Sequence, residues 1–310
     1  LMATAALFGV NPSHAFTSVE TSPEYADRPR LNVLKKAGVS RVSIGIQSFQ
    51  DEELKAIKRR PRQNTIYQAL DDIRQMDFPY FNIDLIYGIK GQTVESFLYS
   101  LEEALRFQPN ELFIYPLYVR QGTGITEREP DDVCFRMYRA ACKLLQAKGF
   151  LQTSMRRFIH HPSTDAEVSC GDEVMLSCGS GGRSYLGDLH YATRYTVCQQ
   201  CIAREIDEYM ATTDFTVARN GFILSAKEQQ QRFIIKNLMY YMGIDKAEYT
   251  RRFGEPLDRT PLFRQLAEQY WIEETPERIR LTPEGLGYSD YIGQLFITPE
   301  IRQLMETYSY

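Results

Sequence analysis

The sequence predicts an α/β fold, a partial barrel of parallel strands and helices, followed by a small helical domain that resembles a winged helix. Two observations support the barrel. Short apolar runs alternate with helical patterns over the first half of the chain, and these runs close on polar residues or glycine. Such alternation is typical of βα units with a parallel sheet. A third observation marks the second domain, because the last third changes to amphipathic helices with one short hairpin.

The first half contains four predicted strands with helices between them. The expected order is strand Thr17–Glu20, a helix ending at Ala37, strand Val42–Ile46, helices ending at Met76, strand Phe81–Tyr87, helix Val94–Phe107 and strand Leu112–Tyr118. Their near-continuous apolar runs indicate strands that are buried on both faces. An open doubly wound sheet would also satisfy this order.

Polar residues at the strand ends favour the barrel and predict where its site lies. Glu20, Gln47, Asp84 and Tyr115–Pro116 stand at or near four successive strand ends. In a parallel barrel the carboxyl ends of the strands surround one opening, and ligands bind there. We therefore expect the active site at these strand ends.

The rest of the chain divides into two further parts. After a helix at 133–147 and a strand at 151–158 we expect the barrel portion, residues 1–165, to end. A glycine-rich connector over the active site should span 166–197, and a helical domain 198–310. Within the last part, Ser225 to Glu228 forms a capping box, 270–281 is a candidate hairpin, and Thr282-Pro283-Glu284 opens a helix.

Composition excludes several classes of protein. The 310 residues are 43% hydrophobic and 25% charged, which is ordinary for a soluble globular chain. A net charge of −4 gives no electrostatic reason to expect nucleic acid or an anionic membrane as a partner. No apolar run is long enough to span a bilayer. Six cysteines in a chain of this length do not form a disulfide scaffold, so a reduced, cytoplasmic setting is expected.

The cysteines allow a metal site, but a structural interpretation is favoured. Cys198 and Cys201 have CxxC spacing, and Cys170 and Cys178 precede them, so four thiolates are available. In a helix, however, cysteines at i and i+3 simply share a face. We predict no metal site from these residues.

Several segments resemble one known family. SVETSP, RVSIGIQSF, NIDLIYGIKGQT and LFIYPLYVRQGTG, in this order and spacing, look like the core of radical S-adenosylmethionine proteins of the oxygen-independent coproporphyrinogen III oxidase type. The similarity continues through CGSGGRSY and LHYATRYTV to LTPEGLGYSDYIGQLF, and so covers most of the chain. The resemblance implies a partial radical SAM barrel with S-adenosylmethionine as cofactor.

The resemblance also implies roles for the strand ends. Glu20, Gln47, Arg59 and Asp84 match family positions that contact S-adenosylmethionine, and the backbone near Pro116 would lie on the adenine side. The chemistry agrees, because ribose hydroxyls and an α-ammonium need carboxylate or amide acceptors, whereas a carboxylate needs a guanidinium. Without the family, the basic run around Arg59 would be taken for a solvated loop.

A glycine-dense segment supplies candidates on the substrate side. The family places a comparable segment over the active site, which makes Arg183, Tyr185, His190 and Tyr191 candidate substrate-binding residues. Arg183 would suit a carboxylate, and the two tyrosines would suit a flat or apolar substrate. Alternatively, both tyrosines pack as amphipathic lid residues and His190 is only hydrogen-bonded. No catalytic residue is assigned.

One family feature does not occur in the sequence. The family binds a [4Fe–4S] cluster through a CxxxCxxC loop that precedes the SVE strand, accompanied by a glycine-rich GGTP-type segment, and neither motif is found here. Because the chain opens on Leu1 within a helical pattern, we expect an N-terminal portion with the cluster ligands to be missing and this fragment to be inactive.

Two functions remain open. The first is an enzyme that cleaves S-adenosylmethionine, with an electron donor, to start radical chemistry on a small carboxylate-bearing substrate, either a tetrapyrrole or a peptide. The second is a haem-binding or haem-carrier protein, since some relatives carry haem, and the GIQSF and YVRQGTG segments resemble both branches.

Overall fold

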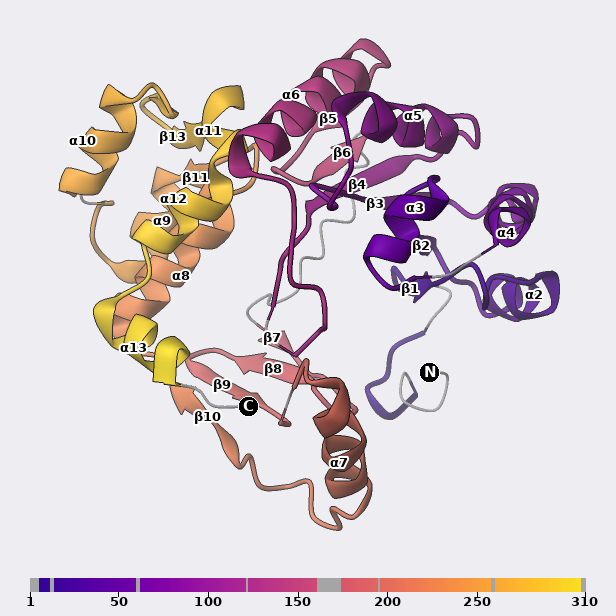
Figure 1. The fold of residues 1–310 in the computed structure, drawn as a ribbon. Helices are drawn as coiled ribbons and strands as arrows, with labels where there is room; N and C mark the ends of the chain where they lie inside the picture. Colours follow the sequence, from indigo (N-terminus) through magenta and orange to yellow (C-terminus); the bar gives the residue numbers. More distant parts are fainter. Residues whose placement is uncertain are drawn as a thin grey trace. The chain divides into compact units, whose positions relative to one another are not determined.

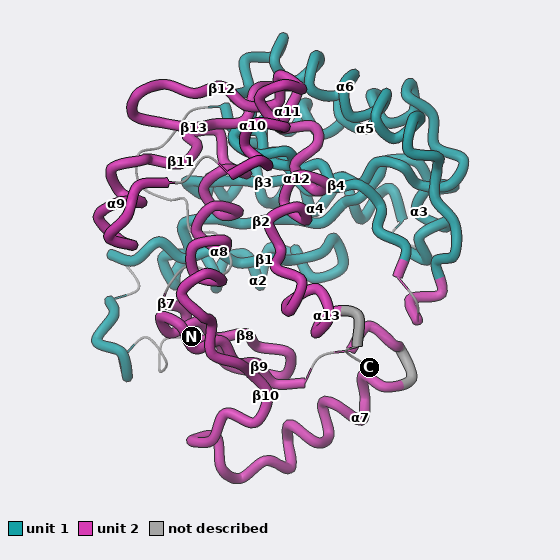
Figure 2. Tube along the Cα trace, turned by 90° about the vertical axis from the view of Figure 1, so that its left-hand side faces the viewer, with its two compact units in different colours: residues 1–119, 125–166 teal, residues 120–124, 167–310 magenta. Residues whose placement is uncertain are grey.

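The computed structural model describes residues 6–11, 14–59, 62–120, 122–160, 174–194, 196–257 and 260–307. The chain forms two compact units (Figure 2). Unit 1 comprises Leu1–Val119 and Ile125–Ala166, and unit 2 comprises Arg120–Gly124 and Glu167–Tyr310. Each unit has its own hydrophobic core. None of the described helices is long and apolar enough to cross a membrane.

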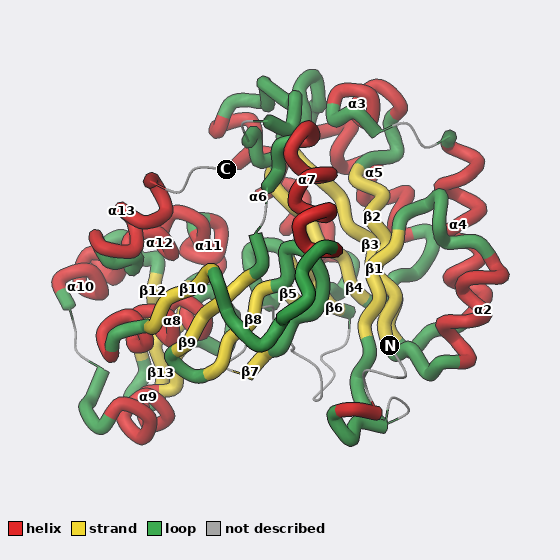
Figure 3. Tube along the Cα trace, turned by 90° about the horizontal axis from the view of Figure 1, so that it is seen from below, coloured by secondary structure: helices red, strands yellow, loops and turns green. Residues whose placement is uncertain are grey.

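Unit 1 is a mixed sheet with helices on its outer side. Its elements are β1 (Ser18–Thr21), α2 (Arg28–Lys36), β2 (Arg41–Gln47), α3 (Asp51–Ala56), α4 (Gln63–Met76), β3 (Tyr80–Tyr87), α5 (Val94–Leu105), β4 (Glu111–Pro116), α6 (Asp131–Ala147), β5 (Leu151–Gln152) and β6 (Arg157–Ile159). The strand order is β1-β2-β3-β4-β6-β5, and β1 to β4 run parallel (Figure 3). Helix α2 packs against α4, and α5 packs against α6 (Figure 1).

The parallel strands alternate two kinds of side chain. Val42, Ile44 and Ile46 of β2 are fully buried in the core. The residues between them face the other side, where the register pairs Ser43 with Asn82 of β3. The prediction of strands buried on both faces is confirmed for β2, but its inner face is polar where an apolar one was expected. A polar inner face suits a strand that borders a ligand site.

The predicted strand 151–158 is the main error in unit 1. The structure forms two short strands, β5 and β6, which pair antiparallel with each other. The Ser154 hydroxyl accepts a hydrogen bond from the backbone N–H of Arg157 at 3.1 Å and closes a tight turn between them. Serine side chains stabilise turns in this way. Strand β6 then pairs antiparallel with β4, so it adds no parallel βα unit.

The first part of unit 2 is a four-stranded antiparallel sheet. It contains β7 (Val174–Met175), β8 (Arg183–Leu186), β9 (Leu189–Ala192) and β10 (Asn220–Ile223), in the order β10-β9-β8-β7, with helix α7 (Gln199–Met210) between β9 and β10. Within the segment expected as a connector, β7, β8 and β9 therefore belong to this sheet, and the glycine-dense stretch 178–182 lies between β7 and β8. The beginning of that segment, 166–173, lies outside the described residues.

The second part of unit 2 has the element order of a winged helix. It contains α8 (Ala226–Leu238), β11 (Ile244–Asp245), α9 (Lys246–Phe253), α10 (Pro261–Glu268), β12 (Ile272–Glu274), β13 (Arg278–Leu281), α11 (Pro283–Gly287), α12 (Ser289–Leu295) and α13 (Pro299–Thr307). Both hydrogen bonds of the predicted capping box form between Ser225 and Glu228. The predicted hairpin is β12–β13, and Thr282 caps α11 as expected.

Candidate functional site

A bulge at the carboxyl end of β2 positions the first group of the site. The pairing of β2 with β3 shifts between Gly45 and Gln47, and Gln47 has a left-handed φ of 73°. This bulge folds the Gln47 amide back over Gly45, where a Cβ atom would lie 2.5 Å from Gln47 Nε2. Glycine at position 45 therefore leaves the space that the amide occupies.

Arg59 reaches the same bulge from the end of helix α3. Its Nη1 donates to the Gly45 carbonyl at 3.4 Å, although the two residues are 14 positions apart. The backbone N–H of Arg59 donates to Leu54 O at 2.8 Å, which closes the end of the helix. Arg59, which the family resemblance singled out in the sequence, thus contacts the end of β2 beside Gln47.

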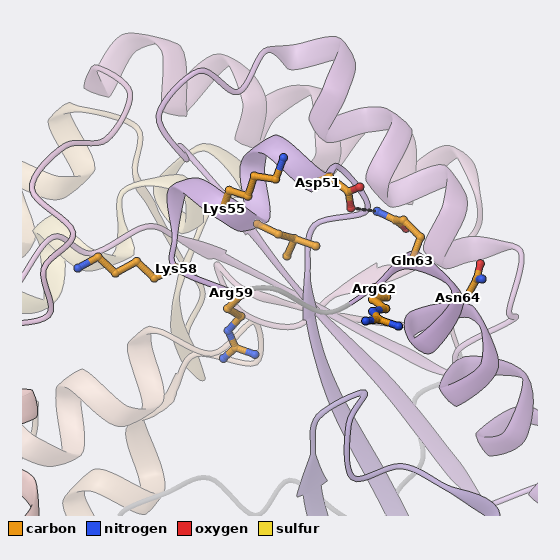
Figure 4. Close-up of a pocket in the computed structure, with 8 residues that line it drawn as sticks. Asp51, Lys55, Lys58, Arg59, Arg62, Gln63 and Asn64 are labelled. Atoms are coloured by element: carbon orange, nitrogen blue, oxygen red, sulfur yellow. Dashed lines mark hydrogen bonds between the residues drawn. The ribbon is translucent and has the colours of Figure 1, made fainter.

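Figure 4 separates Arg59 from the other basic residues nearby. Lys55, Lys58 and Arg59 project in three different directions from the pocket that they line. Lys55 is paired with Glu52 at 2.6 Å and is exposed. Among the described basic residues of this region, Arg59 is the one that contacts the strand end.

Asp84 lies on the polar face of β3, next to the bulge. It pairs with Gly45 across the two strands, and its carboxylate accepts hydrogen bonds from Asn82 Nδ2 at 2.7 Å and Ser43 Oγ at 3.3 Å. Asn82 Nδ2 also donates to Ser43 Oγ at 2.7 Å. Asn82 Oδ1 is buried without a hydrogen-bond partner among the described residues. Buried polar atoms are nearly always satisfied, so this orphan acceptor is consistent with a ligand donor nearby.

The environment of Asp84 favours its neutral form more than usual. Burial raises the pKa of Asp84 to about 6, the hydrogen bond from Asn82 offsets part of this increase, and the negative charge of Glu20 adds to it. Burial likewise raises the pKa of Tyr115, and the charge of Asp84 adds to that increase. Two carboxylates and a neutral phenol thus share one electrostatic environment, which suits a ligand with hydroxyls or a positive charge.

The remaining predicted cofactor residues lie on the neighbouring strands. Glu20 is exposed on β1 and pairs in register with Ser43 of β2. Pro116 ends β4 opposite Tyr87, and the N–H of Leu117 donates to Tyr87 O at 2.8 Å. Glu20, Gln47 and Pro116 therefore stand at or next to the carboxyl ends of β1, β2 and β4, Arg59 lies beside them, and Asp84 lies within β3, before its last residue Tyr87.

A buried ion cluster lies at the opposite, amino-terminal ends of β2 and β4. Glu111 is only 2% exposed and accepts from Arg41 Nε at 2.5 Å and from Arg157 Nε at 3.0 Å. Arg41 also lies over the ring of Phe113, 5.7 Å from its centroid. The charged groups at this end of the strands have a structural role, because each of them is paired with another charged group of unit 1.

A second buried carboxylate holds the loops behind the site. Glu53 of α3 accepts hydrogen bonds from Ser48 Oγ at 2.6 Å, Ser96 Oγ at 2.5 Å and Gln92 Nε2 at 2.9 Å. Gln92 Oε1 in turn accepts from the backbone N–H of Gly88 at 2.8 Å. Because Ser48 directly follows Gln47 and Gly88 directly follows β3, the network positions two strand ends together.

Sequence reasoning did not identify this network. Glu53, Gln92 and the serines Ser48, Ser96 and Ser100 stand in three separate segments of the chain, each ordinary for a helix or loop surface. Their burial appears only when α3 packs beside α5. Ser43 and Asn82 were also missed, although their positions in otherwise apolar strands were a usable signal.

The substrate-side candidates lie on the β8–β9 hairpin of unit 2. Tyr185 pairs with His190, and their rings meet edge to face at 4.4 Å, while Arg183 is exposed on the same face. Tyr191 pairs with Ser184 and faces the other side of the hairpin. Tyr185 and Tyr191 therefore do not form one aromatic surface, because side chains alternate across a strand.

His190 is neutral and has an unused nitrogen. Burial and, to a smaller extent, the nearby charge of Arg232 together lower its pKa to about 4. Its Nε2 is buried and has no hydrogen-bond partner in the described part of the chain. The rings of Tyr185 and Phe222 flank the imidazole, and the guanidinium of Arg232 lies over Tyr185 at 4.6 Å. The alternative that His190 is only a satisfied hydrogen-bonding residue is not supported for this nitrogen.

Comparison with known proteins agrees with the geometry of this site. Residues 2–104 match the Radical SAM superfamily, and residues 224–287 match the HemN C-terminal domain. The fold is thus that of a radical SAM protein. Within that class, the chain belongs to the HemN-like family.

The relatives within this family are named for two different functions. The chain is 26% identical over 295 residues to heme chaperone HemW of Bacillus subtilis (strain 168), covering 90% of this chain and 76% of the relative. It is 25% identical over 291 residues to oxygen-independent coproporphyrinogen III oxidase of Thermostichus vulcanus, covering 86% of this chain and 89% of the relative. Coproporphyrinogen III oxidase (HemN) from Escherichia coli has the same fold, with a TM-score of 0.75 at 20% identity, covering 96% of this chain and 73% of that one.

Radical SAM proteins imply a [4Fe–4S] cluster as well as S-adenosylmethionine. Within the described ranges, no three His, Cys, Asp or Glu side chains converge as metal ligands. The polar groups at the ends of β2 and β3 do fit S-adenosylmethionine, because they combine a guanidinium, an amide and a carboxylate beside an unpaired buried acceptor.

Proposed function

We propose that the strand ends of unit 1 bind S-adenosylmethionine. The observation that carries the proposal is the convergence of Gln47, Arg59 and Asp84 around one bulge of β2. Arg59 supplies a guanidinium for the carboxylate of the methionine part, and the acceptors on Gln47 and Asp84 suit its α-ammonium and the ribose hydroxyls. When bound, S-adenosylmethionine supplies a sulfonium whose C–S bond can be broken.

The chain's own residues would orient this ligand. Glu20 and Asp84 place negative charge beside a cationic ligand, and the raised pKa of Asp84 falls when a positive group approaches. Pro116, at the end of β4, leaves its carbonyl at the opening for the adenine side. Gly45 keeps the space above the bulge open for the Gln47 amide.

We further propose that the substrate is a tetrapyrrole. Two relatives support this proposal. One is named a heme chaperone and the other a coproporphyrinogen III oxidase, and both match more than four-fifths of this chain. A tetrapyrrole with carboxylate side chains fits an exposed arginine such as Arg183. The best-supported function is therefore a radical SAM enzyme of the coproporphyrinogen oxidase type.

Haem binding is a second candidate because of His190. A neutral imidazole with a free nitrogen between aromatic rings is the form that coordinates iron. Its Nε2 and the flanking rings of Tyr185 and Phe222 meet this requirement if the packing opens. The two functions share the same cofactor site but differ in what happens to the tetrapyrrole.

One pair of assays separates these functions. The protein expressed from its complete reading frame is reconstituted anaerobically with iron and sulfide and incubated with S-adenosylmethionine, a reductant and coproporphyrinogen III, whose consumption is followed by chromatography. Haem is titrated in parallel, following the Soret band. The enzyme predicts consumption of coproporphyrinogen, with formation of 5′-deoxyadenosine. The carrier predicts a Soret shift that His190→Ala abolishes, while coproporphyrinogen remains unconsumed.

A further inference from the structure

Two cysteines meet at the start of helix α7, outside the site described above. Cys198 is the N-cap of the helix and Cys201 lies in its first turn. The Cys201 thiol donates a hydrogen bond to Cys198 Sγ, with the two sulfur atoms 3.1 Å apart. Since a disulfide has an S–S length of about 2.05 Å, an approach of about 1 Å would join them.

The backbone explains why these two residues can approach. Cysteines at i and i+3 inside a helix only share a face, but Cys198 precedes the helix with an extended backbone, φ −72° and ψ 113°. Its side chain can therefore turn over the first helical turn. The Cys198 carbonyl accepts from the N–H of Cys201 at 2.9 Å and of Ile202 at 3.1 Å, which holds the turn closed.

A neighbouring glycine, Gly122, leaves room for the backbone of Cys198. Gly122 has a left-handed φ of 88°, and a Cβ atom on it would lie 3.2 Å from Cys198 Cα and 3.4 Å from Cys198 Cβ. Both residues belong to unit 2. Any side chain larger than hydrogen at position 122 would press on the backbone of Cys198, so glycine at this position leaves the space that Cys198 occupies.

From this geometry we propose that Cys198 and Cys201 form a redox-active dithiol that exchanges with small-molecule or protein disulfides. The other cysteines offer no such pair among the described residues. Cys178 is exposed, whereas burial raises the pKa values of Cys134 and Cys142. The proposal does not depend on the S-adenosylmethionine site, because it involves no residue of that site.

The hydrogen bond assigns a role to each sulfur. Cys201 keeps its proton as the donor, and this bond raises its pKa. Cys198 accepts the bond and lies at the amino end of a 12-residue helix, a position that favours a thiolate. Cys198 is therefore the attacking sulfur, and Cys201 is the resolving sulfur.

The exchange balances with a disulfide as the oxidant. The Cys198 thiolate attacks a disulfide RS–SR, forms a mixed disulfide and releases one RS⁻, which takes up a proton. The Cys201 sulfur, after losing its proton, then attacks Cys198 Sγ and releases the second RS⁻. The two protein thiols lose two electrons, and the external disulfide is reduced to two thiols.

A redox titration tests this proposal directly. The purified protein is equilibrated anaerobically in glutathione buffers of varied ratio, quenched with acid, alkylated and digested with trypsin. The peptide 195–204 carries both cysteines between Arg194 and Arg204. We expect both alkylation sites to disappear together, with the disulfide-to-dithiol ratio changing tenfold for each tenfold change in [GSH]²/[GSSG].

Single substitutions separate the two sulfur roles. Cys201→Ser should accumulate a glutathione adduct on Cys198, whereas Cys198→Ser should form little adduct. Cys178→Ser, a matched substitution of an exposed cysteine, should leave the titration unchanged. Circular dichroism of each variant confirms that it is folded. The proposal is overturned if peptide 195–204 stays doubly alkylated at every glutathione ratio, and the role assignment is overturned if the two single variants form equal adducts.

Discussion

Asp84 carries the strongest electrostatic signal in the candidate site. Its carboxyl group is 8% exposed and lies between the Asn82 amide and the Ser43 hydroxyl. Burial raises its pKa from the ordinary 3.8 to about 6. The folded state thus holds a proton on Asp84 more tightly than the unfolded chain does, and ionising this group costs stability that a bound cation would restore.

Replacing Asp84 with asparagine should therefore stabilise the protein in a pH-dependent way. The wild type loses stability as the pH rises from about 4 through 6, because the buried carboxyl must ionise. The neutral Asp84→Asn variant does not, so its advantage should grow to at most about 3 kcal/mol at pH 8. Urea unfolding at pH 4.5 and pH 8 measures the difference. The exposed Asp71→Asn variant is the control, and an equal difference at both pH values would refute the assignment.

Arg59 should matter for S-adenosylmethionine in a way that its basic neighbours do not. Arg59→Ala removes the only guanidinium that contacts Gly45 O among the described residues. A charge-assisted hydrogen bond contributes about 1.5–3 kcal/mol, so binding should weaken roughly 10- to 150-fold. Equilibrium dialysis with labelled S-adenosylmethionine measures this loss. Lys58→Ala, which removes a positive charge one residue away, should bind nearly as the wild type does, and equal losses would mean that only net charge matters.

At the scale of elements, the loops behind the strands depend on a single carboxylate. Glu53 joins α3 to the loop after β2 and to α5 through Ser48, Gln92 and Ser96. Its three partners all donate to it, so a side chain that cannot accept all three bonds leaves buried donors unsatisfied. The network therefore fixes the geometry of the bulge that carries Gln47.

Glu53→Gln should destabilise unit 1 and weaken cofactor binding together. The glutamine NH2 group would face donors, which should cost about 2 kcal/mol or more. Urea unfolding gives the stability, and dialysis gives the affinity for S-adenosylmethionine. The neighbouring Glu52→Gln affects only an exposed pair with Lys55 and should change neither. A Glu53→Gln variant as stable as Glu52→Gln would show that the network is not needed.

Local signals predicted the elements better than they predicted their contacts. The order of β1 to β4 and the capping box at Ser225 followed from apolar runs and caps, which are properties of neighbouring residues. The position of Gln47 at the end of β2 followed as well, whereas Asp84 lies inside β3. The bulge at Gln47 and the burial of Glu53 did not, because each depends on packing between distant segments. The split of 151–158 into two strands depended on the turn at Ser154, which an apolar pattern does not reveal.

On the scale of the whole molecule, two units with separate cores imply separate local stability. Ile83 of β3 is fully buried in the first core, and Leu238 of α8 is fully buried in the second. Domains with their own cores can open independently of each other. The cofactor site proposed here draws all its residues from unit 1, whereas the dithiol and the His190 cluster belong to unit 2.

Matched core substitutions should test this independence. Leu238→Ala should cost about 2–5 kcal/mol and speed amide exchange in α8 and β11 to β13 while leaving β2 and β3 protected. Ile83→Ala should speed amide exchange in β2 and β3 while leaving α8 and β11 to β13 protected. Hydrogen–deuterium exchange followed by mass spectrometry measures both variants under the same conditions. Faster exchange throughout the chain in both variants would indicate one cooperative unit.

The central claim, that the carboxyl ends of the parallel strands bind S-adenosylmethionine, is tested most directly by locating the ligand on the chain. Hydrogen–deuterium exchange of the wild-type protein is compared with and without saturating S-adenosylmethionine. The account predicts slower exchange in the peptides that cover residues 45–59 and 84–89, and no change in peptides from 183–192. Unchanged exchange at 45–59, or protection confined to unit 2, would contradict it.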